Sequence, residues 1–159
     1  MRGTVAPGIA LMVLAGACVP TELACTDIGS ESGVAVTVDR ALAADVTKLA
    51  LRVCWDGTCQ DSNVPLSSGT EARDQGCDGP DPEDTCSATV VPNGTKVGFV
   101  VLEGLPASKI TVSATLTQSS QVRKLRAIDL TGRPTYPNGP GCGAGGNQAQ
   151  VSIGLDGLR

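Results

Sequence analysis

Apolar and polar residues alternate along several short segments of the chain. A period of two is typical of a β-strand with one buried face and one solvated face. The clearest of these segments are 34–38, 49–53, 110–116 and 149–155. Further strand candidates are 88–91, 97–102 and 125–130. Only Arg40 to Lys48 has a composition that favours a helix, and a connector is the alternative for this short segment.

Turn signals separate the predicted strands. The dipeptides Asp56-Gly57 and Asn93-Gly94 are strong signals for tight hairpins. About seven or eight strands with frequent turns predict an all-β fold, and more specifically an antiparallel β-sandwich. We assign this fold to residues 33–159, as one domain that is long enough to bury a core.

Aromatic residues are scarce, because Trp55, Phe99 and Tyr136 are the only ones in the chain. The core must therefore be aliphatic, and disulfides become important, since each typically adds about 2–4 kcal/mol of stability. Protein and sugar contacts rely on exposed Trp and Tyr side chains. Trp55 and Tyr136 both fall in turn regions, so they form the first candidate for a binding patch.

The beginning of the chain has the pattern of a secretion signal. Arg2 precedes an uncharged, mostly apolar stretch, Pro7 to Ala17, which is shorter than the roughly 20 residues that span a bilayer. Residues 1–17 are therefore predicted to be a signal peptide. Ala15-Gly16-Ala17 fits ordinary signal peptidase, whereas Leu14 to Cys18 resembles the bacterial lipobox. In a lipobox, the cysteine becomes the lipidated first residue of the mature protein.

The cysteine count favours the lipobox interpretation. The chain has seven cysteines, and an odd count in a secreted protein leaves one thiol to be explained. Lipid on Cys18 accounts for the odd one and leaves six cysteines for three disulfides in an oxidising compartment. A diacylglyceryl thioether together with an amide-linked chain such as palmitate meets the requirement for stable anchoring. The alternative is a secreted protein without lipid, in which Cys18 is free or pairs with another chain.

Residues 18–32 are small and polar, and we interpret them as a flexible tether. Cys54 and Cys59 flank the turn at Asp56-Gly57, which places them directly opposite each other and predicts a disulfide. The four other cysteines allow three connectivities. We favour Cys77–Cys86 together with Cys25–Cys142.

The chain contains no histidine, which removes the usual general base and every Ser-His or Cys-His catalytic arrangement. We expect no enzymatic activity and no cofactor. Gly141 to Gly146 matches a dinucleotide motif only in its letters, because no helix is predicted after it, and we interpret it as a loop.

Charges are unevenly placed along the chain. The net charge is −4, or −5 once Met1 to Ala17 and with it Arg2 are removed, which argues against binding to nucleic acid or to anionic lipid. Four acids lie in the loop from Asp78 to Asp84 and are interpreted as solvated, with calcium as the alternative and no metal site assigned. The basic cluster from Arg123 to Arg126 is interpreted as a solvated strand face.

Three segments carry a resemblance to a known group of proteins. Ala24 to Gly29, Val53 to Cys59 and Tyr136 to Gly143 resemble small uncharacterised lipoproteins of actinobacteria, over most of residues 18–155. This resemblance implies a location and no activity. Phe99 to Pro106, followed by the strand at Ile110, is similar to prealbumin-like and immunoglobulin-like extracellular modules, which implies the kind of sandwich.

Together these features predict a lipid-anchored protein on the extracytoplasmic face of the cell membrane. We expect it to act as a binding or structural module of the bacterial envelope, with the membrane and an envelope protein as partners. One alternative is an accessory subunit that docks on a membrane enzyme or transporter. Another is a secreted protein without lipid, or a hydrolase that works without histidine.

Overall fold

The computed structural model describes residues 24–119 and 121–159. The predicted signal peptide, Cys18 and the first part of the predicted tether lie outside the described residues. The described part of the chain is almost entirely β, which confirms the all-β prediction. Its elements are β1 (Gly33–Val38), α1 (Arg40–Ala43), β2 (Val46–Trp55), β3 (Thr58–Asn63), β4 (Ser67–Cys77), β5 (Cys86–Val101), β6 (Lys109–Gln118), β7 (Gln121–Thr131), β8 (Arg133–Pro134), β9 (Asn147–Gly154) and β10 (Gly157–Leu158).

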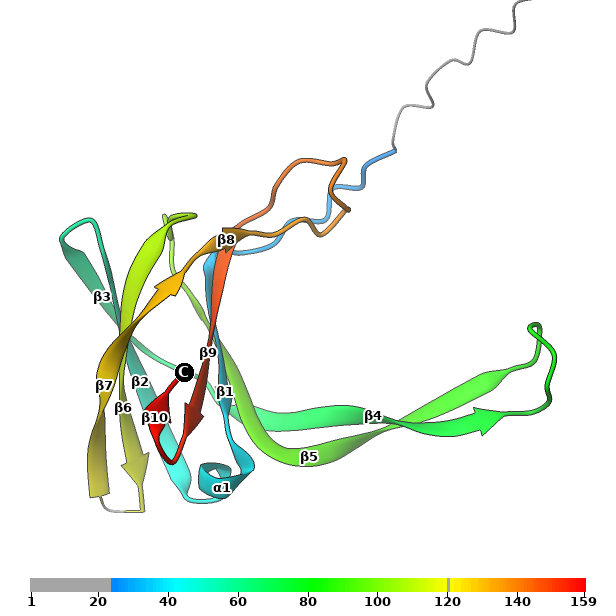
Figure 1. The fold of residues 1–159 in the computed structure, drawn as a ribbon, viewed down its shortest axis with the longest axis horizontal. Coiled ribbons are helices and arrows are strands. Elements are labelled where there is room, and N and C mark those ends of the chain that lie inside the picture. The colour runs from blue at the N-terminus through cyan, green and yellow to red at the C-terminus, as the bar shows by residue number, and fades with distance from the viewer. Residues whose placement is uncertain (1–23, 120) are drawn as a thin grey trace, which may run out of the picture.

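The strands form two sheets (Figure 1). Sheet A has the order β10-β9-β1-β5-β4, with the short β8 also paired to β9, and sheet B has the order β3-β2-β6-β7. Strands β1 and β9 run parallel, which departs from the predicted antiparallel arrangement. The Cys25–Cys142 disulfide joins the segments that precede these two strands, so both enter the sheet from the same end.

The core lies between the sheets and is aliphatic. Its largest fully buried side chains are Leu49, Leu51, Leu102, Leu105, Ile110, Leu116, Ile153, Val34, Val36, Val38, Val46 and Val53. Within the described residues, no polar or charged residue is buried. Nearly all the apolar positions of the alternating segments point inward as predicted. Leu155 does not, because β9 ends at Gly154, and the Leu155 side chain is 62% exposed.

The prediction of a hairpin turn at Asn93-Gly94 is wrong, because both residues lie inside the continuous strand β5. The β4–β5 register shifts there, from Ser68 opposite Lys96 to Thr70 opposite Pro92. Asn93 Oδ1 accepts hydrogen bonds from the backbone N–H and the hydroxyl of Thr95, at 3.0 and 2.7 Å. Gly94 takes a φ of +81°, which glycine adopts at no steric cost. The dipeptide therefore makes a bulge in a long strand.

The predicted helix from Arg40 to Lys48 is much shorter in the structure. Helix α1 ends at Ala43, and β2 begins at Val46 because Val46 and Leu49 point into the core. Leu42 and Ala43 are buried and close the lower end of the core in Figure 1. No helix among the described residues has the length and apolar character needed to cross a bilayer.

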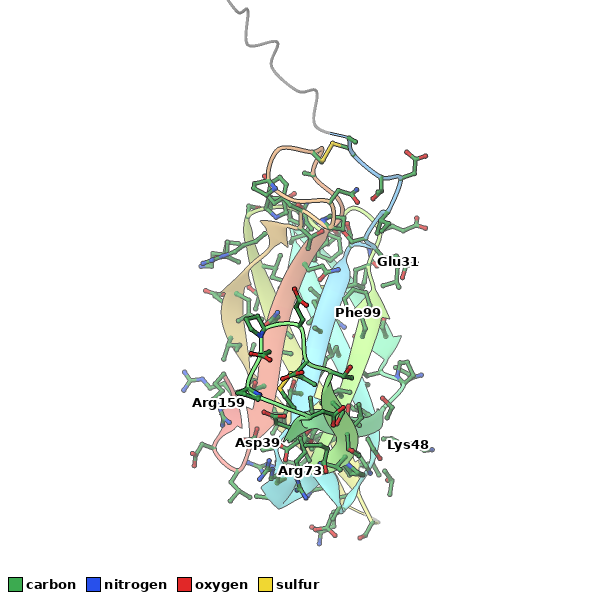
Figure 2. The ribbon with its side chains drawn as sticks, turned by 90° about the vertical axis from the view of Figure 1, so that its right-hand side faces the viewer. Glu31, Asp39, Lys48, Arg73, Phe99 and Arg159 are labelled. Carbon is green, nitrogen blue, oxygen red and sulfur yellow. A yellow bond between two sulfur atoms is a disulfide. The ribbon has the colours of Figure 1, made fainter. Side chains whose placement is uncertain are left out.

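Strands β4 and β5 continue past the rest of sheet A as a two-stranded arm, which we define as residues 70–92 (Figure 1). At about 3.3 Å per residue, the arm is about 25 Å long. It leaves the body in the half that contains α1, whereas the loop that carries Cys142 lies at the opposite end. Figure 2 is turned by 90° about the vertical axis, so that the arm points toward the viewer. A disulfide lies near the start of the described chain at the top, and Arg73 of the arm is labelled near the bottom.

Candidate functional site

No side chain of the arm belongs to the buried core. Val90, on one face of the arm, is 69% exposed. Its cross-strand partner is Ala72, and the next pair along the same face joins Asp74 to Ala88. This face therefore carries a short apolar strip of Ala72, Ala88 and Val90 that no other described residue covers. No strand pairs with the outer edge of the arm in either sheet.

The arm is also the acidic part of the molecule. It contains six carboxylates and one arginine, a net charge of −5, which equals the net charge expected for the whole mature chain. Its single ion pair with the body joins Arg40 to Glu71 at 3.5 Å, and both side chains are largely exposed. The remaining five carboxylates lie farther out along the arm. The arm therefore presents a negative potential to any molecule that approaches it.

A disulfide between Cys77 and Cys86 closes the outer end of the arm, with 4.0 Å between the Cα atoms. The two cysteines are also direct partners in the β4–β5 register. An isolated two-stranded hairpin is marginally stable in water. The bridge holds the two strands together where no third strand supports them.

Replacing Cys77 and Cys86 together by serine should loosen the arm and leave the core folded. We expect amide exchange at Ala72 and Val90 to become much faster, while the exchange of core amides such as that of Leu116 changes little, because the arm contributes no core side chain. Hydrogen exchange followed by mass spectrometry measures both. Equal loss of protection in the arm and in the core would show that the bridge stabilises the whole domain.

The acidic loop between these cysteines is organised by hydrogen bonds within the loop. Asp84 Oδ2 accepts a bond from the backbone N–H of Asp81 at 2.7 Å, and the backbone N–H of Asp78 donates to Thr85 O at 3.1 Å. Among the described residues, no group of three or more acidic, cysteine or histidine side chains is placed to hold a metal ion. Calcium stays an untested alternative for this loop.

The outer face of sheet B has the opposite charge. The strands of sheet B carry six basic and two acidic residues. Arg123 is the register partner of the buried Leu116 and points to the inner side, where it donates to Leu155 O at 2.8 Å. Without Arg123 the net charge is +3.

On the outer face, a shallow hollow of about 320 Å³ lies over the small residues Ala50, Ser113 and Thr115. Arg52, Asp61 and Lys124 also line it.

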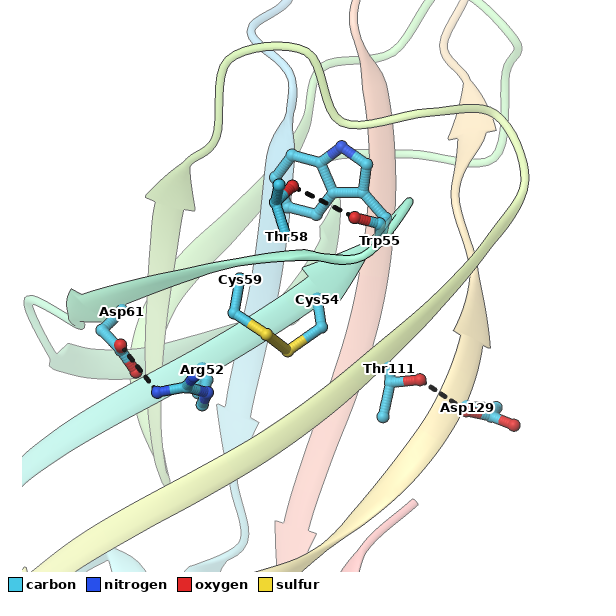
Figure 3. The surroundings of a disulfide bond; sticks show 8 residues. All are labelled: Arg52, Cys54, Trp55, Thr58, Cys59, Asp61, Thr111 and Asp129. Carbon is cyan, nitrogen blue, oxygen red and sulfur yellow. Dashed lines mark hydrogen bonds and ion pairs between the residues drawn. A yellow bond between two sulfur atoms is a disulfide. The ribbon is translucent and has the colours of Figure 1, made fainter.

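Two ion pairs fix part of this face, and Figure 3 shows the first of them, together with the hydrogen bond between Thr111 and Asp129. Arg52 Nη1 lies 3.0 Å from Asp61 Oδ2, across the β2–β3 pair. Lys109 Nζ lies 2.6 Å from Asp129 Oδ2, and Thr111 Oγ1 donates to Asp129 Oδ1 at 2.8 Å. Hydrogen bonds from Lys109 and then from Thr111 hold the pKa of Asp129 below its ordinary value.

The lowered pKa of Asp129 gives a pH prediction. Because the ionised form is favoured in the folded protein, this group stabilises the fold above the ordinary aspartate pKa of 3.8, and the contribution is lost as the pH falls through the folded value. The Lys109→Gln variant should raise the pKa of Asp129. A carboxyl carbon NMR titration measures it, and an unchanged pKa would show that Lys109 does not set it.

The two residues of the predicted aromatic patch lie on different elements. Trp55 lies at the end of β2, is partly buried and packs against the core, and its carbonyl accepts a bond from Thr58 Oγ1 at 3.2 Å (Figure 3). Tyr136 lies on the loop between β8 and β9 and is 48% exposed. The two rings come from different elements, and Trp55 is partly withdrawn from solvent.

The disulfides link the pairs that the sequence analysis favours: Cys25–Cys142, Cys54–Cys59 and Cys77–Cys86. Cys54 and Cys59 face each other in the β2–β3 register, as the turn predicts. Cys25–Cys142 spans 117 residues and joins the start of the described chain to the glycine-rich loop. We call residues 24–32 together with residues 135–146 the clamp.

Backbone contacts complete the clamp. The backbone N–H of Gly146 donates to Ser30 O at 2.9 Å, and Asn138 Nδ2 donates to Ile28 O at 2.9 Å. A Cβ at position 146 would lie 2.5 Å from backbone atoms of Glu31 and Ser32, so only glycine allows this approach. The clamp therefore fixes the point at which the N-terminal segment reaches the domain.

The sequence analysis missed the arm as a site, although it noted the acids at its tip. Residues 88–91, which include Val90, were predicted as a strand, but nothing in the sequence indicated that this strand is exposed, and Ala72 had no signal of its own. Comparison with protein-family models, with curated proteins and with solved structures finds no match to this chain. The candidate site therefore depends on the geometry and charge of the arm and of sheet B.

Proposed function

We propose that this protein is a lipid-anchored β-sandwich of the immunoglobulin-like or prealbumin-like kind, held on the extracytoplasmic face of the cell membrane through Cys18. It acts as a binding module of the bacterial envelope, and the arm is the element that contacts its protein partner. It works without a cofactor and without catalysis, since the chain has no histidine and the carboxylates of the arm are exposed.

The projecting arm is the observation that carries this proposal. A two-stranded ribbon with open edges and an uncovered apolar strip invites association, and proteins normally cover or shorten such elements. This chain instead extends the ribbon by about 25 Å and closes its end with a disulfide. An exposed element that is kept ordered in this way supports a role in binding another protein.

The charge of the arm indicates which class of molecule it can bind. A net charge of −5 on the arm repels nucleic acid and anionic lipid headgroups, and favours a protein surface with positive potential. The clamp lies at one end of the body, and the arm leaves the half near α1 (Figure 1). Anchoring through Cys18, seven positions before Cys25, would place the arm in the aqueous layer above the lipid.

Site-specific photo-crosslinking tests this function. A photo-reactive amino acid is placed at Val90 on the arm or, as the matched control, at Val101 in the body. Both are exposed valines of β5, at 69% and 50%. In cells that produce the full chain, the probe at position 90 should give a discrete protein adduct and the probe at 101 should give none.

Two results would contradict a docking arm: equal adducts at both positions, or no protein adduct at position 90. The identity of the adduct decides which partner is bound. A soluble or lipid-anchored envelope protein supports the binding module. An integral membrane protein in a fixed ratio would replace it with the accessory-subunit alternative.

A further inference from the structure

We infer that the arm binds the outer face of sheet B on a second copy of this chain, so that copies join head to tail. This inference rests on the proposed function, because it names the partner of the same arm. The arm of one copy and the outer face of sheet B on the other copy are the two sides of this contact, and each copy of the chain carries both.

Charge complementarity is the first argument. The arm has a net charge of −5, and the strands of sheet B, without the inward-pointing Arg123, have a net charge of +3. Of the six basic residues on sheet B, Arg52 and Lys109 already form ion pairs with Asp61 and Asp129. Lys48, Lys124 and Arg126 make no ion pair with any described residue. They are therefore available to carboxylates of another molecule.

The shape of the sheet B face is the second argument. Its hollow has a floor of small side chains, so a narrow ribbon can approach the sheet closely. Asp61 and Arg52, which form an ion pair, line one side of the hollow, and Lys124 lines it as a base without an ion pair among the described residues. Val122, on β7 of the same sheet, is 65% exposed. The apolar strip around Val90 on the arm gives this exposed valine an apolar partner. Both halves of the contact thus combine charge with a small apolar area.

The positions of the two surfaces exclude a contact within one molecule. In Figure 1, sheet B lies on the left of the body and the arm points to the right. A copy cannot lay its arm on its own sheet B, but it can reach the sheet B of a neighbour. The arm and the outer face of sheet B are different surfaces, so the contact between them is heterologous. Repeating this contact from copy to copy gives an open row. Pairing two arms would instead bring two charges of −5 together, which is unfavourable.

The position of the clamp is compatible with an open row of copies that are all anchored in one membrane. The clamp lies at the upper end of the body in Figure 1, while the arm leaves sideways. A row that grows along the arm by a nearly pure translation keeps every clamp on the same side. Neighbouring copies can then be anchored in one membrane at the same time, and anchoring raises their effective concentration.

Sedimentation velocity on the purified full mature chain tests the inference, with Cys18→Ser to remove the proposed lipid. At low salt, the protein should form dimers and larger species as its concentration rises, and added salt should dissociate them, because exposed charges are screened. The Lys124→Glu variant should weaken association about tenfold, since it turns an attraction into a repulsion. Arg133→Glu is the matched control and should associate like the parent, because Arg133 lies on β8 of sheet A.

Mixing two defective variants separates head-to-tail contact from symmetric pairing. One variant has no arm: Asn-Gly replaces residues 71–91, and this two-residue turn joins Thr70 to Pro92, which are already partners in the register. The other variant is Lys124→Glu, which keeps the arm. Neither should self-associate well, but the mixture should form a one-to-one dimer that does not grow.

Several results would overturn the inference. They are a parent protein that stays monomeric at every concentration and salt level, a Lys124→Glu variant that associates as strongly as the parent, or a mixture that contains no dimer. If the armless variant does not fold by circular dichroism, Asp81→Lys with Glu83→Lys replaces it in the mixture and must give the same dimer. A monomeric parent combined with a foreign adduct at Val90 would leave the proposed function standing and remove only the second copy as partner.

Discussion

Replacing Cys18 by serine should move the protein from the membrane fraction to the soluble extracytoplasmic fraction. We expect nearly complete relocation, because the lipid on Cys18 is the only anchor that the account provides and the described part of the chain has no helix that could span a bilayer. Fractionation of cells followed by immunoblotting measures the distribution. Cys18 lies outside the described residues, so this experiment tests the sequence prediction directly.

The control for this variant is the double replacement Cys54→Ser with Cys59→Ser. It also removes cysteine, but it leaves Cys18 and the predicted lipobox unchanged, so the protein should stay in the membrane fraction. If the Cys18→Ser protein remains membrane-bound, an anchor other than lipid on Cys18 must exist. If the wild-type chain is already soluble, the secreted alternative is correct.

Replacing Leu116 by alanine should cause the largest loss of stability among single substitutions that spare the disulfides. Leu116 lies on β6, an inner strand of sheet B, and its side chain is fully buried. Truncating a buried leucine typically costs about 2–5 kcal/mol, through lost burial and the cavity left behind. Leu116 lies directly opposite the buried Leu49, and its strand is held between two others in sheet B, so we expect little collapse around the gap and a cost in the upper half of that range.

Denaturant unfolding under non-reducing conditions measures this free energy. Val122→Ala is the matched control, because Val122 lies on the neighbouring strand β7 and is 65% exposed. Its free energy of unfolding should change by no more than about 0.5 kcal/mol. Equal losses in the two variants would contradict the placement of Leu116 in the core.

The body of the fold follows from local sequence pattern. Strands such as β6 have one buried face, so each second residue from Ile110 to Leu116 must be apolar, and this alternation is visible in the chain. The Cys54–Cys59 bridge is equally local, because a two-residue turn determines which residues oppose each other. In both cases the information lies within ten residues.

Of the arm, only 88–91 was predicted as a strand; the rest could not be predicted, because the strands of the arm have no buried face. Nine of the eleven residues of β4 are polar, glycine or charged without alternation, and only pairing with β5 keeps the strand extended. The hairpin turn predicted at Asn93-Gly94 was a second reason. This dipeptide usually closes a hairpin, but here it forms a bulge in β5. The turn type depends on which strand lies alongside, and that is a contact between distant residues.

The two charged surfaces were visible in the sequence only as separate clusters. The acids from Asp78 to Asp84 and the bases from Arg123 to Arg126 each suit a solvated surface when considered alone. Their significance comes from the fold, which places one cluster on an arm and the other on the opposite side of the body (Figure 1). Sequence spacing does not contain that geometry.

The intact mass of the protein extracted from the membrane fraction, before and after reduction, tests the central claim most directly. We expect a chain that begins at Cys18, carries diacylglyceryl and acyl groups, and gains two hydrogens on reduction for each of its three disulfides. A chain of unlipidated mass, recovered from the medium, would contradict the anchored module, and would make a covalent dimer through Cys18 the leading interpretation.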